Sequence, residues 1–91
     1  MDFDWDERKD RRNQAVHGIA FENALRVFFD PLHEIIFDER ENYGEERLTV
    51  FGIAFGSLLA VTYTLRGETI RIISARKATR QERKRYEDQK I

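Results

Sequence analysis

The chain has no cysteine and only one proline among its 91 residues. The lack of cysteine excludes disulfide bonds, thiolate metal ligands and a thiol nucleophile, and it fits a reducing cytoplasm. No apolar run approaches the roughly 18 residues that a membrane-spanning helix needs. The acidic residues 1–6 also lack the apolar core of a secretory signal. We therefore expect a cytoplasmic protein that does not contact a membrane.

Motifs that hold metals or nucleotides are also missing. The chain has only two histidines, and its acidic stretch 38–46 lacks the spacing of a calcium loop. No glycine-rich loop of the kind that cradles phosphates is present. The sequence therefore predicts neither a metal site nor a cofactor.

The length of the chain limits the number of domains, and the distribution of charge indicates which part could bind a polyanion. A chain of 91 residues has room for one domain with a thin core, so we expect a single domain over residues 1–91. Residues 1–65 carry 7 Lys/Arg and 13 Asp/Glu, whereas residues 66–91 carry 9 and 4. The basic C-terminal part could engage a polyanion such as RNA, or it could simply be the charged face of a solvated helix.

Two helices are predicted in the N-terminal third of the chain. Asp4 or Asp6 can cap a first helix that ends near Val16, with Gly18 placed to adopt the left-handed conformation that ends many helices. Residues 21–29 have apolar side chains at spacings of three and four, which predicts a second helix with one apolar stripe.

The remainder of the chain predicts an antiparallel β-meander and a final helix. Residues 47–55, 58–66 and 69–76 are rich in β-branched and aromatic side chains, and residues 56–57 and 67–68 separate them as two-residue hairpin loops.

Shorter signals flank this meander. Asp30-Pro31 stops the second helix, and residues 34–37 follow as a short strand. Thr79 and Glu82 form a capping-box pattern that opens a basic C-terminal helix, with Tyr86 as its main apolar anchor. The predicted fold class is therefore α+β, with two N-terminal helices, an antiparallel meander and a C-terminal helix.

The loop lengths assign side chains to the two faces of the sheet. A loop at 56–57 places Arg47 opposite Arg66, and the loop at 67–68 brings Arg71 onto the same threonine-lined face. Three guanidinium groups there could bind RNA phosphate, or each could pair with a carboxylate such as Glu45 or Glu46. The opposite face is predicted to be the core, with Leu48, Val50, Leu59, Val61, Tyr63, Leu65, Ile70 and Ile72.

Two further groups could carry chemistry. Arg76, Lys77, Arg80 and Arg83 belong to a basic run that could track phosphates or could be a solvated helix face. His17 could act as a general acid or base, although a histidine at a helix C-terminus often only complements the helix dipole. His33 is expected to be exposed.

Several segments together resemble the BrnT family of ribonuclease toxins. The resemblance spans about residues 3–87. The motifs that carry it are Trp5-Asp6, Asn13, His17-Gly18, Phe21-Glu22, Ala24, Asp30-Pro31, Gly44-Glu45-Glu46-Arg47, residues 71–79, Glu82-Arg83 and Tyr86-Glu87. Two positions depart from the family pattern. Val16 stands where the family usually has lysine, and Ala20 stands where Ser or Thr often caps the next helix.

The resemblance implies a RelE-like fold and a role in a type II toxin–antitoxin module. Such a toxin cleaves RNA without a metal and so inhibits translation. It is neutralised by a BrnA-like antitoxin. The toxin contacts operator DNA only indirectly, as part of its complex with this antitoxin.

Candidate site residues follow from this resemblance and from the face assignment. Arg47 and Arg76 lie in matching motifs and can stabilise charge on the phosphate, while Glu46 and His17 are the candidates for the general base. Arg66 and Arg71 are added on geometry, and Lys77, Arg80 and Arg83 as RNA-binding residues. Two alternatives remain: a non-catalytic RNA- or protein-binding module, and a structural subunit that is stable only in a complex.

Overall fold

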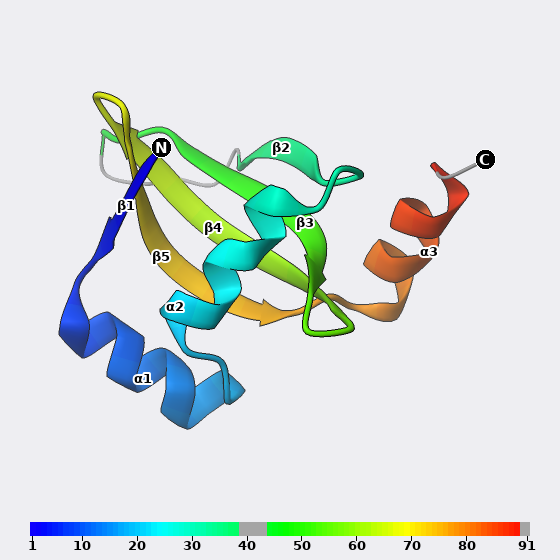
Figure 1. The fold of residues 1–91 in the computed structure, drawn as a ribbon, viewed down its shortest axis with the longest axis horizontal. Helices are drawn as coiled ribbons and strands as arrows, with labels where there is room; N and C mark the ends of the chain where they lie inside the picture. The colour runs from blue at the N-terminus through cyan, green and yellow to red at the C-terminus, as the bar shows by residue number, and fades with distance from the viewer. Residues whose placement is uncertain (39–43, 90–91) are drawn as a thin grey trace.

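A five-stranded sheet with helical segments against it forms the protein (Figure 1). The computed structural model describes residues 1–38 and 44–89. The predicted α+β class is confirmed. The elements are β1 (Asp2–Trp5), α1 (Glu7–His17), α2 (Phe21–Ala24), the 3₁₀ helix η1 (Leu25–Phe29), β2 (Glu34–Asp38), β3 (Arg47–Ala54), β4 (Ser57–Arg66), β5 (Thr69–Lys77) and α3 (Arg80–Asp88).

The sheet contains one strand more than the sequence predicts. Its order is β1-β5-β4-β3-β2, in which β3 to β5 form the expected antiparallel meander and the predicted short strand β2 extends it by pairing with β3. The additional strand β1 pairs in parallel with β5, with Phe3 opposite Ile70 and Trp5 opposite Ile72. A four-residue strand that alternates acidic and aromatic side chains gives too short a pattern to recognise. The prediction of a purely antiparallel sheet was therefore wrong at this edge.

The first helix begins and ends where the sequence predicts. The Asp6 carboxylate accepts a hydrogen bond from the backbone N–H of Arg8 at 2.8 Å, and Gly18 closes the helix with a φ of 72°. The prediction of one continuous second helix over residues 21–29 was wrong. α2 is a single turn without a side-chain cap at Ala20, and the chain then continues as the 3₁₀ helix η1. Its β-branched and aromatic residues are weak helix formers, which favours this tighter and shorter geometry.

The register of the first hairpin differs from the prediction by one residue on each strand. The two loop residues are Phe55 and Gly56, and both have positive φ, 51° and 78°. A turn with two positive φ values matches the twist of paired strands. Leu48 therefore lies opposite Tyr63, and the predicted pairing of Arg47 with Arg66 was wrong. The faces are nevertheless as predicted, because a shift of one residue on both strands preserves the alternation. The prediction that Leu65 lies in the core was wrong: at the end of β4 it lies outside the core cluster and is 55% exposed.

A β-bulge in β5 changes which residues share a face. Tyr63 of β4 pairs with Ile72 of β5, and the preceding residue of β4, Thr62, pairs with Ser74. Ile73 therefore has no partner on β4 and is the bulged residue. Beyond this bulge the alternation is reversed. Ala75 then points into the core, and Ser74 lies on the face of Thr62.

The core lies between the sheet and the segment formed by α2 and η1, which crosses one face in Figure 1. Phe21, Val27, Val50 and Val61 are fully buried there, and Tyr63 is buried as predicted. A Cβ on Gly52 would lie 2.7 Å from the carbonyl oxygen of Val27, so η1 packs directly on the β3 backbone.

A second apolar cluster lies on the other face of the sheet. It contains Phe51, Leu58, Ala60, Ala78 and Tyr86, which confirms Tyr86 as the anchor of α3. Within residues 1–38 and 44–89, no helix has the length and apolar character needed to cross a membrane.

Candidate functional site

Asn13 attaches α1 to the edge of β5 where β1 has ended. Its side-chain amide donates to the carbonyl of Ala75 at 2.9 Å and accepts from the N–H of Ala75 at 3.1 Å. The same amide donates to the carbonyl of Ile19 at 2.8 Å. One side chain thus replaces the strand that is missing at this point of the ladder, because it satisfies both backbone groups of a buried residue.

The attachment of α1 creates a groove between this helix and β5, which we call the α1–β5 groove. Its volume is about 280 Å³. His17 contributes to it from α1, and Arg47 contributes from β3, two strands away from β5. The groove therefore brings together two predicted site residues that lie 30 positions apart. Its lining residues are Lys9, Arg12, Asn13, Val16, His17, Arg47, Ile73 and Ser74.

The α1–β5 groove carries an excess of positive charge. Lys9, Arg12 and Arg47 line it, and its lining contains no acidic residue. The Nε atom of Arg47 is buried and has no hydrogen-bond partner among the described residues. A terminal nitrogen of Arg47 lies 3.9 Å from the Glu45 carboxylate, a long contact. A buried N–H without a partner costs free energy, so Arg47 loses little if its side chain turns toward an anion in the groove.

The other two arginines of the predicted triad are paired with carboxylates. Arg66 lies 3.7 Å from Glu45, and Arg71 lies 3.2 Å from Asp4. The predicted alternative of pairing with a nearby carboxylate therefore describes this region. Such surface pairs contribute only about 0–1 kcal/mol each, so a phosphate could replace the carboxylates at little cost.

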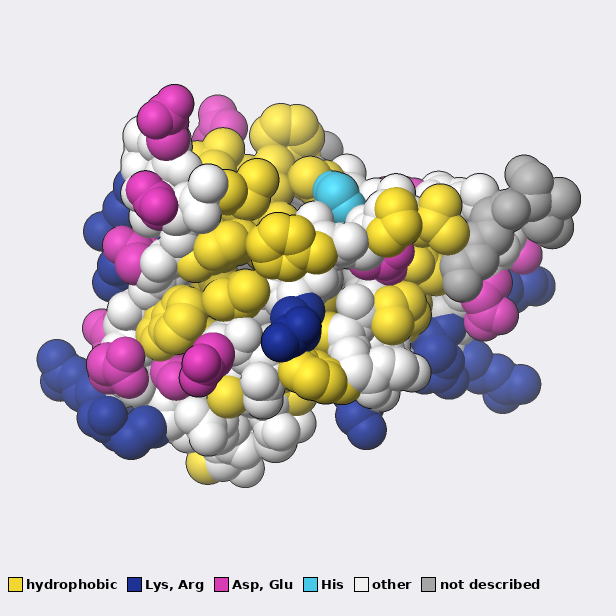
Figure 2. Space-filling model, in the orientation of Figure 1, with side chains coloured by type: hydrophobic (Ala, Val, Ile, Leu, Met, Phe, Trp, Pro, Cys, Tyr) yellow, Lys and Arg dark blue, Asp and Glu magenta, His cyan; other side chains and the backbone are white. Residues whose placement is uncertain are grey.

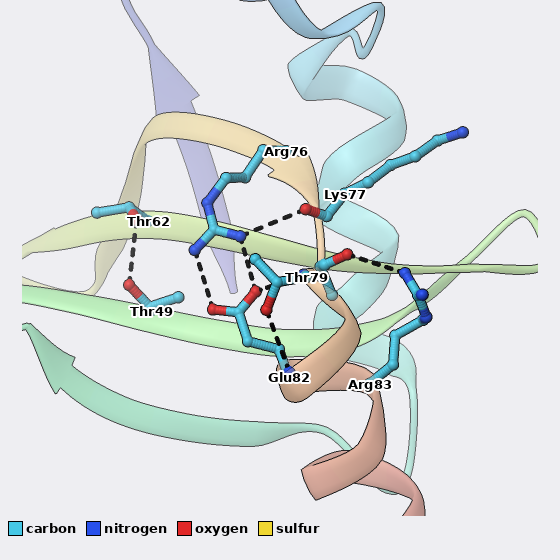
Figure 3. Close-up of polar contacts among 8 residues, drawn as sticks. Thr49, Thr62, Arg76, Lys77, Thr79, Glu82 and Arg83 are labelled. Carbon is cyan, nitrogen blue, oxygen red and sulfur yellow. Dashed lines mark hydrogen bonds and ion pairs between the residues drawn. The ribbon is translucent and has the colours of Figure 1, made fainter.

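Arg76 is held more firmly than the other arginines. Its two terminal nitrogens lie 2.8 and 3.0 Å from the two oxygens of Glu82, a bidentate pair (Figure 3). Glu82 also accepts from the N–H of Thr79 at 2.8 Å and so completes the predicted capping box. The hydrogen bonds from Arg76 are the main reason that the pKa of Glu82 is lowered to about 2.

This ion pair predicts a specific dependence of stability on acid. Because the pKa of Glu82 is lower in the folded chain than in the unfolded chain, the pair stabilises the fold above the unfolded pKa and is lost as pH falls toward 2. Glu82→Gln retains a capping side chain but not the charge. We expect it to lower the free energy of unfolding by about 1 kcal/mol near pH 7, after allowance for solvent screening.

The measurement is urea unfolding of both proteins across the acid range. The difference between wild type and Glu82→Gln should shrink steadily as pH falls from the ordinary glutamate range toward 2. A difference that is the same at every pH would show that the carboxylate acts only through its shape and capping role.

Hydroxyl groups lie on the same face of the sheet as Arg47 and Arg76. The side chains of Thr49 and Thr62 are hydrogen-bonded at 3.1 Å (Figure 3), and Ser74 is the partner of Thr62 on β5. We call this face, with Arg47 at one end and Arg76 at the other, the arginine–threonine face. It is the bulge in β5 that brings Ser74 and Arg76 onto it.

The basic run near α3 does not form one surface. Arg76 points toward the sheet and Glu82, whereas Arg83 donates to the carbonyl of Ala78 at 3.2 Å (Figure 3). Lys77 and Arg80 are exposed. Only Arg76 of this run thus lies on the arginine–threonine face.

The remaining candidates have other surroundings. The side chain of Glu46 is exposed, and its backbone carbonyl accepts from the hydroxyl of Thr64 at 2.7 Å. His33 is exposed, as predicted, and its ring lies 2.7 Å from the carbonyl of Asp30. The Tyr86 hydroxyl donates to the Asp30 carboxylate at 2.5 Å. Burial and this hydrogen bond raise the pKa of Tyr86 to about 12, so it remains protonated at neutral pH.

Sequence reasoning missed several residues of the α1–β5 groove. Lys9, Arg12 and Ser74 line it, and Asn13 positions its helical wall. Asn13 and Ser74 lie in segments that carry the family resemblance, and Lys9 and Arg12 precede His17 on the predicted helix, but neither signal predicted a groove. Over the described parts of the chain, no cluster of three or more His, Asp or Glu residues could hold a metal ion.

A family comparison identifies the class of protein to which this site belongs. The family model described as ribonuclease toxin, BrnT, of type II toxin-antitoxin system matches residues 5–82. That match includes both α1 and β5, and so both walls of the groove. By its family, the chain is a ribonuclease toxin of a type II toxin–antitoxin system. It belongs to the BrnT family. Comparison with curated proteins gives no match.

Proposed function

We propose that this chain cleaves RNA in the α1–β5 groove and thereby arrests translation, and that a BrnA-like antitoxin neutralises it. The observation that carries the proposal is the meeting of His17 and Arg47 in one cationic groove. The proposal includes a single domain with a RelE-like arrangement of helices around its sheet. It also includes action on RNA in the cytoplasm. Contact with operator DNA would be made only through the antitoxin.

The chemistry needs two functions from the protein. Cleavage proceeds when the ribose 2′-hydroxyl attacks the adjacent phosphorus, the bond to the 5′-oxygen breaks, and a cyclic phosphate remains. An imidazole can remove the 2′ proton near neutral pH, which suits His17 as the general base. Water, or His17 after taking that proton, can protonate the departing 5′-oxygen. Glu46 is the second candidate for the base.

Arginines supply the second function, which is stabilisation of the charge that grows on the phosphate oxygens. Arg47 is the first choice, because its Nε has no partner within residues 1–38 and 44–89 and its contact with Glu45 is long. Arg76 must first give up a bidentate pair with Glu82, so we place it second. Arg66, Arg71, Lys77, Arg80 and Arg83 are proposed to bind flanking phosphates, with affinity that falls as salt rises.

The proposed function is tested by growth and by cleavage. Induction of the chain alone should arrest growth, and the purified chain should cleave RNA at the same rate with and without EDTA, since all proposed groups are side chains. A rate that falls with EDTA and recovers with added metal would contradict the metal-free mechanism.

The carboxylate pairs of Arg66, Arg71 and Arg76 favour a second candidate, a non-catalytic RNA- or protein-binding module. The same preparation distinguishes the two. Salt-dependent RNA binding without any cleavage product would replace the nuclease with a binding module.

A further inference from the structure

An exposed apolar pocket lies at the β3–β4 hairpin, where η1 meets the end of β3. It has a volume of about 410 Å³. Figure 2 shows hydrophobic side chains spread across the face of the molecule that η1 crosses. We call the pocket the hairpin patch. Its lining residues are Arg26, Phe29, Asp30, Pro31, Ile53, Ala54 and Phe55.

Phe55 is an unusual residue for its position in this patch. It has a φ of 51°, a left-handed conformation that most side chains avoid, and it precedes Gly56 in a turn that favours Asn-Gly. Its side chain is nevertheless 70% exposed, and Phe29 beside it is 68% exposed. A strained backbone that presents an aromatic ring to solvent does not help the chain to fold. An outlier of this kind points to a function.

Arg26 and Asp30 are the two charged residues of the patch. The Asp30 carboxylate already accepts hydrogen bonds from the N–H of Ile53 and the hydroxyl of Tyr86. The guanidinium group of Arg26 lies 4.9 Å from the centre of the Phe55 ring, a cation–π contact. Among the described residues, Arg26 makes no ion pair. Because the Asp30 carboxylate is engaged within the fold, the guanidinium group of Arg26 is the charge available to a partner. The patch therefore complements a segment that has apolar side chains and one carboxylate.

We propose that the hairpin patch is where the antitoxin docks, through an apolar segment that places a carboxylate against Arg26. The proposal rests on the proposed function, because a type II toxin has a protein antitoxin as its partner. No residue of the patch lines the α1–β5 groove. Docking and cleavage can therefore be separated by mutation.

Phe55→Asn is the decisive variant, because its effects on folding and on docking have opposite signs. Asparagine suits the left-handed turn, so the melting temperature should stay the same or rise. Affinity for the purified cognate antitoxin should fall roughly tenfold or more, as expected when an aromatic anchor is removed. Cleavage of RNA without antitoxin should equal that of wild type.

Two further variants complete the test. Arg26→Glu should weaken antitoxin binding by a similar factor, whether or not Phe55→Asn folds well. Leu65→Asn is the matched control, since Leu65 is 55% exposed at the far end of β4 and outside the patch, and it should bind as wild type does.

Wild-type affinity in both Phe55→Asn and Arg26→Glu would overturn the docking proposal. So would self-association of the wild-type chain that either variant abolishes, because the patch would then serve a second copy. If wild type cleaves no RNA, the proposed nuclease fails, while the binding measurements still decide the docking site.

Discussion

Replacing Arg47 with alanine is expected to lower the rate of RNA cleavage by about 100-fold or more, and to abolish growth arrest at equal expression. An electrostatic donor that acts on the transition state contributes on this scale. Arg47 suits this role because it lines the α1–β5 groove, and because its buried Nε has no hydrogen-bond partner among the described residues. Initial rates on a defined RNA, with melting curves to confirm folding, are the measurement.

Arg66→Ala is the matched control for that experiment. Both arginines lie near Glu45, at 3.9 and 3.7 Å, but Arg66 does not line the groove. Its replacement should change mainly the concentration of RNA needed for half-maximal rate, by a few-fold. If Arg47→Ala and Arg66→Ala lose the same fraction of the cleavage rate, pairing with Glu45 matters for cleavage and the α1–β5 groove does not.

The same cleavage assay tests His17, and here the pH dependence of the rate is the informative measurement. His17→Ala should reduce the maximal rate by about 100-fold or more if the imidazole transfers the proton. The acidic limb of the pH–rate profile should disappear with it. A profile that keeps its shape in His17→Ala would assign the base to another group, with Glu46→Gln as the next variant.

Replacing Asn13 with leucine is expected to lower the free energy of unfolding by about 3 kcal/mol. The change keeps the approximate size of the side chain but leaves the N–H and carbonyl of Ala75 unpaired in a buried position. Each unpaired buried group costs about 1–3 kcal/mol. In a domain of this size, a loss of that magnitude lowers the melting temperature by roughly 12–24 °C.

Gln14→Leu provides the control, because Gln14 is the exposed neighbour of Asn13 on α1. Thermal unfolding should separate the two variants, and amide hydrogen exchange at Ala75 should accelerate only in Asn13→Leu. An unchanged melting temperature in Asn13→Leu would mean that α1 is held to β5 by other contacts. The groove would then not depend on this amide.

Local signals were sufficient where a few neighbouring residues decide the structure. The capping carboxylate of Asp6, the left-handed Gly18 and the capping box at Thr79 set the limits of two helices, because each satisfies backbone groups within one turn. The alternation of apolar side chains placed Tyr63 in the core for a similar reason. The family resemblance also came from the residues themselves, and the family model supports it.

Only the tertiary structure decided how these elements are aligned. The loop of the first hairpin is Phe55-Gly56, one residue earlier than the predicted loop. The strand β1 belongs to the sheet because it pairs with β5, which is distant in the sequence. The bulge at Ile73 then carried Ser74 and Arg76 onto the face that the register assigns to Thr62. These features depend on contacts between segments far apart in the chain, which no local pattern encodes.

The α1–β5 groove is the clearest instance of the difference. The sequence by itself supplied its chemistry, since His17 and Arg47 were candidates on residue type and motif. Their meeting required Asn13 to take the place of a strand beside Ala75, and Arg47 to line a groove two strands away from its own. Side-chain chemistry is a property of single residues, whereas the distance between two of them is set by the packing of the whole sheet.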